Sequence, residues 1–422
     1  MKLFKLSVLG AAVLAASAAQ ANFLEDSSFD IKLRNVVFDY DGVSDDSDFR
    51  QWAQGIEANF KSGYIGDVIG FDASYYGALK LDHAGDNVYD DLLGGSQGDK
   101  SYGKIGQAYL KAKLGDDTLN FYGQAGLMGL DAGLMASSGS RATPSSFRGF
   151  YGEVNIHDVK VFSSYVDQIS LRTSTGYDDF TNEAGKKIDN AYQFGGTYNG
   201  NNISAEVVYL ESQDYQQQNL VSLGYKLPIN EGMALSFGGI YHEAKENGKL
   251  WDGAFDDKAE HYNLNTTFSV HALDVTLSYA KTNADKANGL GQFQYSFADN
   301  EYGSTPSKVS RQLSDFMYNG ESAWQLAAGY RFDRLGAAGL KTTLTYTKGT
   351  GIEDNSSGIR TKVMDNEHET DLEVSYAFQQ PELEGLSVKL QHAWHTAQYS
   401  SNHEDEKQKD LRFYVDYTVS VF

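Results

Sequence analysis

The residue types that perform chemistry are present in this chain, but no catalytic pattern joins them. Nine histidines are scattered along 422 residues, and cysteine is absent. No HExxH stretch occurs, so the pattern that sets two zinc ligands and a general base on one helix is missing. Two acid-rich segments, 41–48 (DGVSDDSD) and 402–407 (NHEDEK), could bind Ca²⁺ or Mg²⁺ weakly, but neither has EF-hand spacing. We expect solvated charge in these segments, with no metal, no cofactor and no enzymatic activity.

Charged residues recur at every second position of many stretches, which indicates an electrostatic role. The basic residues that the alternation places on the polar, lumen-facing side of their strands are Lys32, Arg34, Lys61, Lys80, Lys111, Lys113, Lys160, Lys226, Arg331, Lys341, Lys389 and Arg412. The acidic residues placed on the same side are Asp30, Glu57, Asp72, Glu153, Glu206, Asp274, Asp371, Glu373 and Asp416. Such a row could guide anions, or its charges could simply pair across neighbouring strands. We expect pairing for most of them and select Arg34, Arg331, Lys111 and Lys113 as candidates that line an anion path.

The elements that carry these residues are expected to be β-strands, because apolar and polar residues alternate with period two. The end of the chain, LRFYVDYTVSVF, alternates over its whole length. The pattern predicts about eighteen strands of about ten residues each, the length of a tilted membrane-spanning strand. They are 27–38, 51–62, 67–81, 104–114, 118–124, 148–156, 159–168, 190–199, 202–212, 217–227, 233–243, 261–270, 273–283, 322–332, 339–348, 369–379, 386–396 and 408–421.

The predicted connections alternate in length. Short links such as 157–158 and 271–272 alternate with long polar ones such as 82–103 and 284–321. Short turns on one rim and long loops on the other are typical of outer-membrane barrels. The apolar parity is also rich in aromatic residues near strand ends, as interface girdles require. We therefore predict an all-β fold, a transmembrane antiparallel barrel with short periplasmic turns and long extracellular loops, over the alternative of a large soluble β-sandwich or β-helix.

The two ends of the sequence agree with export to such a membrane. Residues 1–21 combine two lysines, a short apolar run and Ala19-Gln20-Ala21, so we expect a signal peptide there and a barrel over 22–422. The formal net charge of −22 argues against a nucleic-acid partner. Phe422, the last residue, is similar to the terminal aromatic residue of barrels that the outer-membrane assembly machinery recognises.

Several stretches resemble one family, the OprD-type substrate-specific outer-membrane porins. They are FLEDSSFDIKLRNVVFDYD near the start, SGSRATPSSFRG in the middle, SDFMYNGESAWQLAAGYRFDRLGAAGLKTTLTYTKG further on, and DLRFYVDYTVSVF at the end. They follow in register across nearly the whole chain. The resemblance implies an 18-stranded barrel whose third loop, 125–147, and seventh loop, 284–321, narrow the pore.

The resemblance also implies a function and further site residues. Arg141 and Arg148 match the two arginines of the family's R…FRG segment and are expected in a basic track at the constriction, where we also place Asp315 of the seventh loop. The expected function is passive, selective diffusion of small hydrophilic nutrients, anionic or amino-acid-like. A chitooligosaccharide porin is the alternative function. Four aromatic residues of the seventh loop could stack on sugar rings or could merely anchor the loop: Phe293, Tyr295, Phe297 and Tyr302. A barrel hydrolase is the third possible function. Expected partners are small solutes, outer-membrane lipid and lipopolysaccharide, and the barrel assembly machinery, with the protein a monomer or loose trimer.

Overall fold

The computed structural model describes residues 23–422 except 24, 45–46, 86–90, 359–361 and 401–403. The expected signal peptide, 1–21, lies outside the described residues, as do parts of both acid-rich segments. No helix in the described part of the chain is long and apolar enough to cross a membrane.

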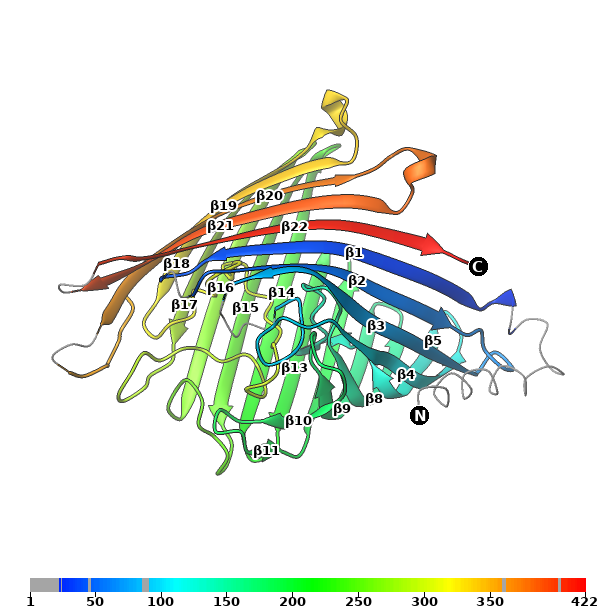
Figure 1. Cartoon of the computed structure of the whole chain (residues 1–422), viewed down its shortest axis with the longest axis horizontal. Coiled ribbons are helices and arrows are strands. Elements are labelled where there is room, and N and C mark those ends of the chain that lie inside the picture. Colours follow the sequence, from blue (N-terminus) through cyan, green and yellow to red (C-terminus); the bar gives the residue numbers. More distant parts are fainter. Residues whose placement is uncertain (1–22, 24, 45–46, 86–90, 359–361, 401–403) are drawn as a thin grey trace.

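In the described ranges one large antiparallel sheet of twenty strands dominates the fold, beside the small β6–β7 sheet, and eighteen of the twenty strands form a closed wall (Figure 1). The wall strands are β1 (Ser28–Asp41), β2 (Phe49–Lys61), β3 (Ile69–Ala84), β4 (Tyr102–Gly115), β5 (Leu119–Met128), β8 (Ser146–Ile156), β9 (Val159–Ser170), β12 (Ala191–Gly200), β13 (Ile203–Ser212), β14 (Gln216–Asn230), β15 (Met233–Glu246), β16 (Lys258–Val270), β17 (Leu273–Asn283), β18 (Ser322–Arg331), β19 (Leu340–Thr350), β20 (Val363–Ala377), β21 (Leu386–Ser400) and β22 (Glu406–Ser420). The short strands β6 (Asp131–Ala132), β7 (Met135–Ala136), β10 (Asp178–Thr181) and β11 (Lys187–Ile188) belong to loops, and η2 (Phe332–Leu335) and η3 (Pro381–Leu383) lie in turns.

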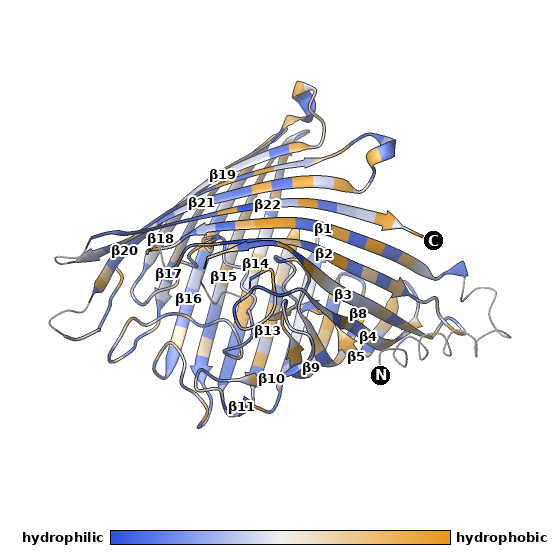
Figure 2. Ribbon diagram, in the orientation of Figure 1, coloured by the Kyte–Doolittle hydropathy of each residue, from blue (hydrophilic) through white to orange (hydrophobic). Residues whose placement is uncertain are grey.

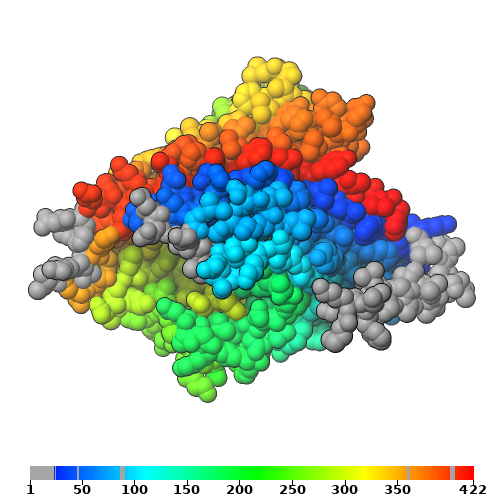
Figure 3. Space-filling model, viewed as in Figure 1, coloured from blue at the N-terminus to red at the C-terminus, as the bar shows by residue number. Residues whose placement is uncertain are grey.

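The wall closes where the first strand pairs with the last. β1 and β22 run antiparallel with Arg34 opposite Asp416, and they lie side by side in Figure 1. At the end of this seam that holds the C-terminus, the Phe29 amide donates to the Phe422 carbonyl (3.1 Å), and the Val421 amide donates to the Phe29 carbonyl (2.8 Å). In the space-filling view the blue and red strands meet along this seam (Figure 3). The pairing removes the two sheet edges that an open sheet would leave unsatisfied.

The predicted alternation separates an apolar outer face from a polar inner face. Bands of opposite hydropathy succeed one another along each strand in Figure 2. Large apolar side chains such as Leu110 (64% exposed) and Leu264 (63% exposed) point away from the barrel. The polar parity faces the lumen, where Asp72 and Lys111 form a buried ion pair of 2.6 Å. This inside-out distribution suits a barrel surrounded by lipid.

The connections differ in length on the two rims, as predicted. The turn rim carries 62–68, 116–118, 157–158, 201–202, 231–232, 271–272, 332–339 and 378–385. In one of the four two-residue turns, Asn201 (φ 52°) and Asn202 (φ 65°) adopt the left-handed backbone that a type I′ hairpin requires. The loop rim carries 42–48, 85–101, 129–145, 171–190, 213–215, 247–257, 284–321, 351–362 and 401–405.

The eighteen-strand prediction is confirmed, and the bounds of 284–321 are those expected, whereas some strands are longer than predicted. β20 begins at Val363 and not at residue 369. After Val363 and Met364, the residues Asp365-Asn366-Glu367-His368 are polar on both faces, so no apolar–polar alternation marks this part as a strand. The third loop is shorter than predicted, 129–145 in place of 125–147, because β5 extends to Met128 and β8 begins at Ser146.

We expect the purified protein to require detergent, to give a β-type circular dichroism spectrum and to migrate differently on gels before and after boiling. A closed wall has no frayed edge at which unfolding can start, so the folded barrel survives unheated detergent. A mainly helical spectrum, or full solubility without detergent, would contradict this fold.

Candidate functional site

Loop 3, residues 129–145, folds against the inner wall of the barrel. Its β6–β7 hairpin places Leu134 and Met135, both fully buried, against Phe162 of β9 and other apolar wall residues. The fully buried side-chain amide of Gln193 on β12 accepts from the Leu134 amide (3.0 Å) and donates to the Ala132 carbonyl (2.8 Å). One end of loop 3 is therefore attached to the β9–β12 side of the wall.

The following part of loop 3 reaches the opposite side of the barrel. Arg34 Nη1 donates to the carbonyls of Gly139 (2.7 Å) and Arg141 (2.9 Å), and the Tyr414 hydroxyl donates to the Ser140 carbonyl (3.1 Å). Gly55 of β2 lies directly against the backbone of this segment, and a Cβ at Gly55 would be 2.2 Å from the Ala142 carbonyl oxygen. Loop 3 thus spans the lumen from β12 to the seam between β1 and β22.

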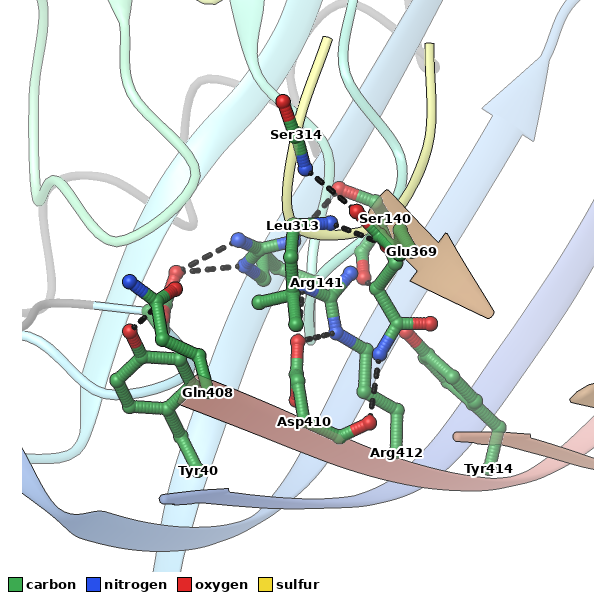
Figure 4. Close-up of polar contacts among 12 residues, drawn as sticks. Tyr40, Ser140, Arg141, Leu313, Ser314, Glu369, Gln408, Asp410, Arg412 and Tyr414 are labelled. Carbon is green, nitrogen blue, oxygen red and sulfur yellow. Dashed lines mark hydrogen bonds and ion pairs between the residues drawn. The ribbon is translucent and has the colours of Figure 1, made fainter. Parts of the chain in front are cut away.

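Loop 7, residues 284–321, fills the lumen beside the inner faces of β14 to β22. Phe293 and Phe297 are buried, and Gln216 and Gln218 of β14 donate to backbone carbonyls of residues 294 and 295. At the far end the amides of Leu313 (2.9 Å) and Ser314 (2.8 Å) donate to the Glu369 carboxylate of β20, as drawn in Figure 4. The interpretation of Phe293 and Phe297 as loop anchors is confirmed.

Basic side chains converge where loop 3 meets the seam. Figure 4 draws Arg141 and Arg412 in one part of the lumen with Asp410 and Tyr414. Three arginines in this region have carboxylate partners: Arg34 with Asp416 (2.7 Å), Arg141 with Asp91 (2.7 Å) and Arg412 with Asp410 (2.5 Å). Burial lowers the pKa of Arg141, and the nearby charge of Arg172 lowers it further. Arg141 therefore lies in a buried position with a second cation, Arg172, nearby.

Other cations of this region form no ion pair within the described ranges. Lys389 lies over the Tyr414 ring (4.5 Å from Nζ to the ring centroid), and Arg172 of the loop 171–190 lies over the Tyr302 ring (3.5 Å). Arg311 of loop 7 donates to the Lys308 carbonyl (2.8 Å). No direct ion pair compensates their charges in the described residues, although the carboxyl groups of Asp371, Glu369 and Glu373 lie near Arg311.

A cavity of about 440 Å³ opens between residues 310–312 of loop 7 and the wall strands β19 to β22. Arg311, Lys341 and Arg412 contribute positive charge to its lining, and Asp371 and Glu373 of β20 contribute negative charge. A small solute in it would meet groups of both signs within one space.

The structure brings only two of the predicted site residues, Arg34 and Arg141, together at loop 3. Lys111 and Lys113 lie nearer the turn rim of the lumen, beside the turn 62–68, where Lys113 Nζ is 4.2 Å from the Tyr64 ring centroid. Arg331 ends β18 on the turn rim, bound to Asp274 (2.7 Å) and to the His271 carbonyl (2.8 Å). These three residues line the lumen away from loop 3.

Arg148 and Asp315 do not line the constriction. Arg148 shares its parity on β8 with Phe150, which is 61% exposed on the outer face, and it forms an ion pair with Asp167 (2.7 Å). Asp315 is enclosed within loop 7, where Tyr295 (2.8 Å) and Ser310 (2.5 Å) donate hydroxyl hydrogen bonds to it. Burial raises the pKa of the Asp315 carboxyl. The expectation that both residues face the pore is corrected accordingly.

Sequence reasoning missed Arg172 and Arg311 as members of the basic region. Both lie in loops, where period-two alternation carries no information about which side chains face the lumen. The stacking partner of Arg172, Tyr302, is 130 positions away in loop 7, so no local pattern in the sequence joins them.

One short segment matches the G-x-S-x-G pattern of serine hydrolases, Gly94-Gly95-Ser96-Gln97-Gly98. It forms an exposed turn in the loop 85–101, closed by the isolated bridge between Gly94 and Lys100. A nucleophile elbow requires a strand that leads sharply into a helix, and this turn does not have that geometry.

Comparison with known proteins assigns the fold to a family. The family model described as "outer membrane porin, OprD family" matches residues 21–421. The chain belongs to the OprD family. Porin D of Pseudomonas aeruginosa is 28% identical over the whole of both chains, and the porin-like protein GalP of Pseudomonas putida is 21% identical over 97% of this chain and 96% of its own.

Solved structures of similar fold include two further porins. OccAB3 of Acinetobacter baumannii has a TM-score of 0.79 at 21% identity and covers 94% of this chain and all of its own. OpdK of Pseudomonas aeruginosa, solved with vanillate, has a TM-score of 0.77 at 24% identity with the same coverage. This OprD-family porin is therefore a multi-pass β-barrel of the Gram-negative outer membrane that admits small solutes, with loops on the extracellular rim and turns on the periplasmic rim.

Gly55→Ala is expected to displace loop 3, because its new Cβ would lie 2.2 Å from the Ala142 carbonyl oxygen. Single-channel conductance in planar bilayers should rise, because the loop that fills the lumen must move. Gly329→Ala is the matched control, since a Cβ there has its nearest neighbour at 3.5 Å. Equal conductance of both variants and the parent would contradict the close approach of loop 3 to β2.

Glu301→Gln is expected to stabilise the protein at pH 8 and to have a much smaller effect near pH 4.5. Glu301 is 5% exposed in loop 7, and burial raises the pKa of its carboxyl to about 8. The unfolded carboxyl titrates near about 4.3, so between these two pKa values only the unfolded state loses the proton. Stability must then fall as pH rises through this interval, and glutamine removes the effect.

Melting temperatures of Glu301→Gln and of the parent, followed by heat-dependent gel mobility, measure this difference from pH 4.5 to pH 8. The exposed Glu382→Gln serves as the control. A difference that is constant with pH would refute the assignment of a buried, protonated Glu301.

Proposed function

We propose that this porin is a passive channel, with no enzymatic step, that favours small anionic or amino-acid-like solutes. The single observation that supports this best is the cluster of basic side chains beside loop 3. Arg172, Lys389 and Arg311 form no ion pair in the described part of the chain, so their fields act on a passing solute. In a narrow, partly desolvated lumen such charges interact more strongly than in bulk water.

The solute class follows from the cavity beside this cluster. A carboxylate could approach Arg412 or Lys341 while an ammonium group approached Asp371 or Glu373. A simple carboxylate would use only the basic side. Amino acids and small organic anions are therefore the solutes that this lining suits, and the related OpdK was solved with vanillate.

The sugar-porin alternative has less support. Sugar uptake would require aromatic faces open to the lumen for stacking. Phe293 and Phe297 are buried, the Tyr295 hydroxyl is bound to Asp315, and the Tyr302 ring is covered by the Arg172 guanidinium. The loop 7 aromatics thus serve mainly as packing.

Neutralising Arg172 and Lys389 together, as Arg172→Gln and Lys389→Gln, is expected to reduce the preference for anions. One charge about 8 Å from the ion path, at an effective dielectric constant near 40, changes the ion's energy by about 1 kcal/mol, or about fivefold in permeability. Reversal potentials in a salt gradient measure the change, and liposome swelling with benzoate, arginine and chitooligosaccharides ranks the solutes.

Arg148→Gln is the matched control, since this arginine lies on the outer parity of β8 and its loss should leave the reversal potential unchanged. If the double variant passes every solute at the parental rate, the basic cluster is not the filter. If chitooligosaccharides pass faster than benzoate in the parent, the sugar-porin alternative replaces the proposal.

A further inference from the structure

The hydrogen-bond donors of Arg34 are nearly all used by the protein itself. Arg34 Nε and Nη2 donate to the two oxygens of Asp416 (2.7 and 3.1 Å), and Nη1 donates to the Gly139 and Arg141 carbonyls. A guanidinium has five N–H donors, so four of them have acceptors within this porin. Little of Arg34 remains to bind a solute.

The charge of Arg34 is also compensated where it arises. Asp416 is its direct neighbour across the closing seam, and their bidentate pairing is the geometry in which arginine and a carboxylate bind most strongly. The carboxylate also fixes the plane of the guanidinium, so that Nη1 points at loop 3. An anion in the pore therefore meets a neutral pair at this position.

The acceptors in loop 3 are three consecutive carbonyls. Gly139, Ser140 and Arg141 each direct a carbonyl to the seam, where Arg34 takes the first and third and Tyr414 takes the second. The strands that supply these donors are β1 and β22. Loop 3 is therefore held by the two strands that close the barrel.

The attachment on the far side is of a different kind. There the β6–β7 hairpin is buried among apolar wall residues and bound by Gln193. Packing of this sort persists when one polar contact is lost. At the seam, residues 139–141 are held by polar contacts, whereas the next residue, Ala142, is buried in an apolar cluster with Val36 and Tyr414. The Arg34 side chain is 29% exposed.

We propose that Arg34, together with Asp416 and Tyr414, forms a seam clamp that sets the position of loop 3 and hence the width of the pore. Arg34 is a positioning residue in this assignment and contributes little to ion preference. Lysine cannot replace it, because a single ammonium group cannot pair with both carboxylate oxygens and reach two carbonyls at once. The inference concerns pore width and holds whichever solute the pore admits.

The test compares Arg34→Lys, which keeps the charge, with Arg34→Gln, which removes it. Both are expected to raise single-channel conductance by about twofold and to increase current noise, because the freed loop no longer narrows the lumen. The reversal potential of Arg34→Lys should match the parent. Arg331→Lys and Arg331→Gln are matched controls, since Arg331 also binds one carboxylate and one carbonyl but lies on the periplasmic rim.

A spin label reports loop 3 directly. The chain has no cysteine, and a Cβ at Gly139 would have no heavy atom within 4 Å, so Gly139→Cys offers a site for a single label. Its spectrum should be broad in the parent background and in the Arg331 variants, and narrow in both Arg34 variants. Tyr414→Phe, which removes one of the three carbonyl contacts, should give an intermediate mobility.

The outcomes separate the clamp from an anion-binding role. If Arg34→Lys behaves as the parent while Arg34→Gln alone shifts the reversal potential, Arg34 acts through its charge and the clamp is refuted. An immobile label and unchanged conductance in both Arg34 variants would also refute it. Heat-dependent gel mobility shows whether each variant is folded. If Arg34→Gln fails to fold, Arg34→Lys and Tyr414→Phe still distinguish the clamp from an anion-binding role.

Discussion

A bilayer offers no hydrogen bonds to a backbone, and this constraint governs the rest of the structure. Every amide and carbonyl in the hydrocarbon layer must find a partner within the protein, so a sheet can span it only as a closed wall. Closure by β1 and β22 meets the requirement but leaves a lumen that no strand fills. The lumen can be narrowed only by segments that fold inward, and in the described residues loops 3 and 7 do so.

Irregular backbone inside a barrel faces the same requirement as the wall, because much of it is shielded from water. Loop 3 meets it with side chains of the wall: Gln193 on one side, Arg34 and Tyr414 on the other. Loop 7 meets it through Gln216, Gln218 and Glu369. Much of the polar lining that resembles a solute path is thus occupied in holding the loops.

How much could be predicted from the sequence depends on what period-two alternation encodes. It encodes the face of a residue, which is why the strand count and the lumen position of Lys111 are correct. It does not encode the depth of a residue along the pore, so it could not show that Arg331, a candidate for the anion path, lies on the periplasmic rim. For Arg148, parity with Phe150 already indicates the outer face, and the family resemblance led away from it.

Side-chain directions in the loops could not be inferred in this way, because loop residues show no regular apolar–polar alternation. The contact of Arg172 with Tyr302 depends on two loops folded into one lumen, and the bonds from Arg34 to Gly139 and Arg141 join residues over a hundred positions apart. The seam clamp shows what such contacts add. In the sequence Arg34 is one of a row of basic residues on a polar parity, whereas in the barrel Asp416 compensates its charge and loop 3 accepts from its donors. In our proposals, a charge that is compensated and bonded in this way sets the shape of the pore, and ion preference is assigned to the cations that form no ion pair in the described part of the chain.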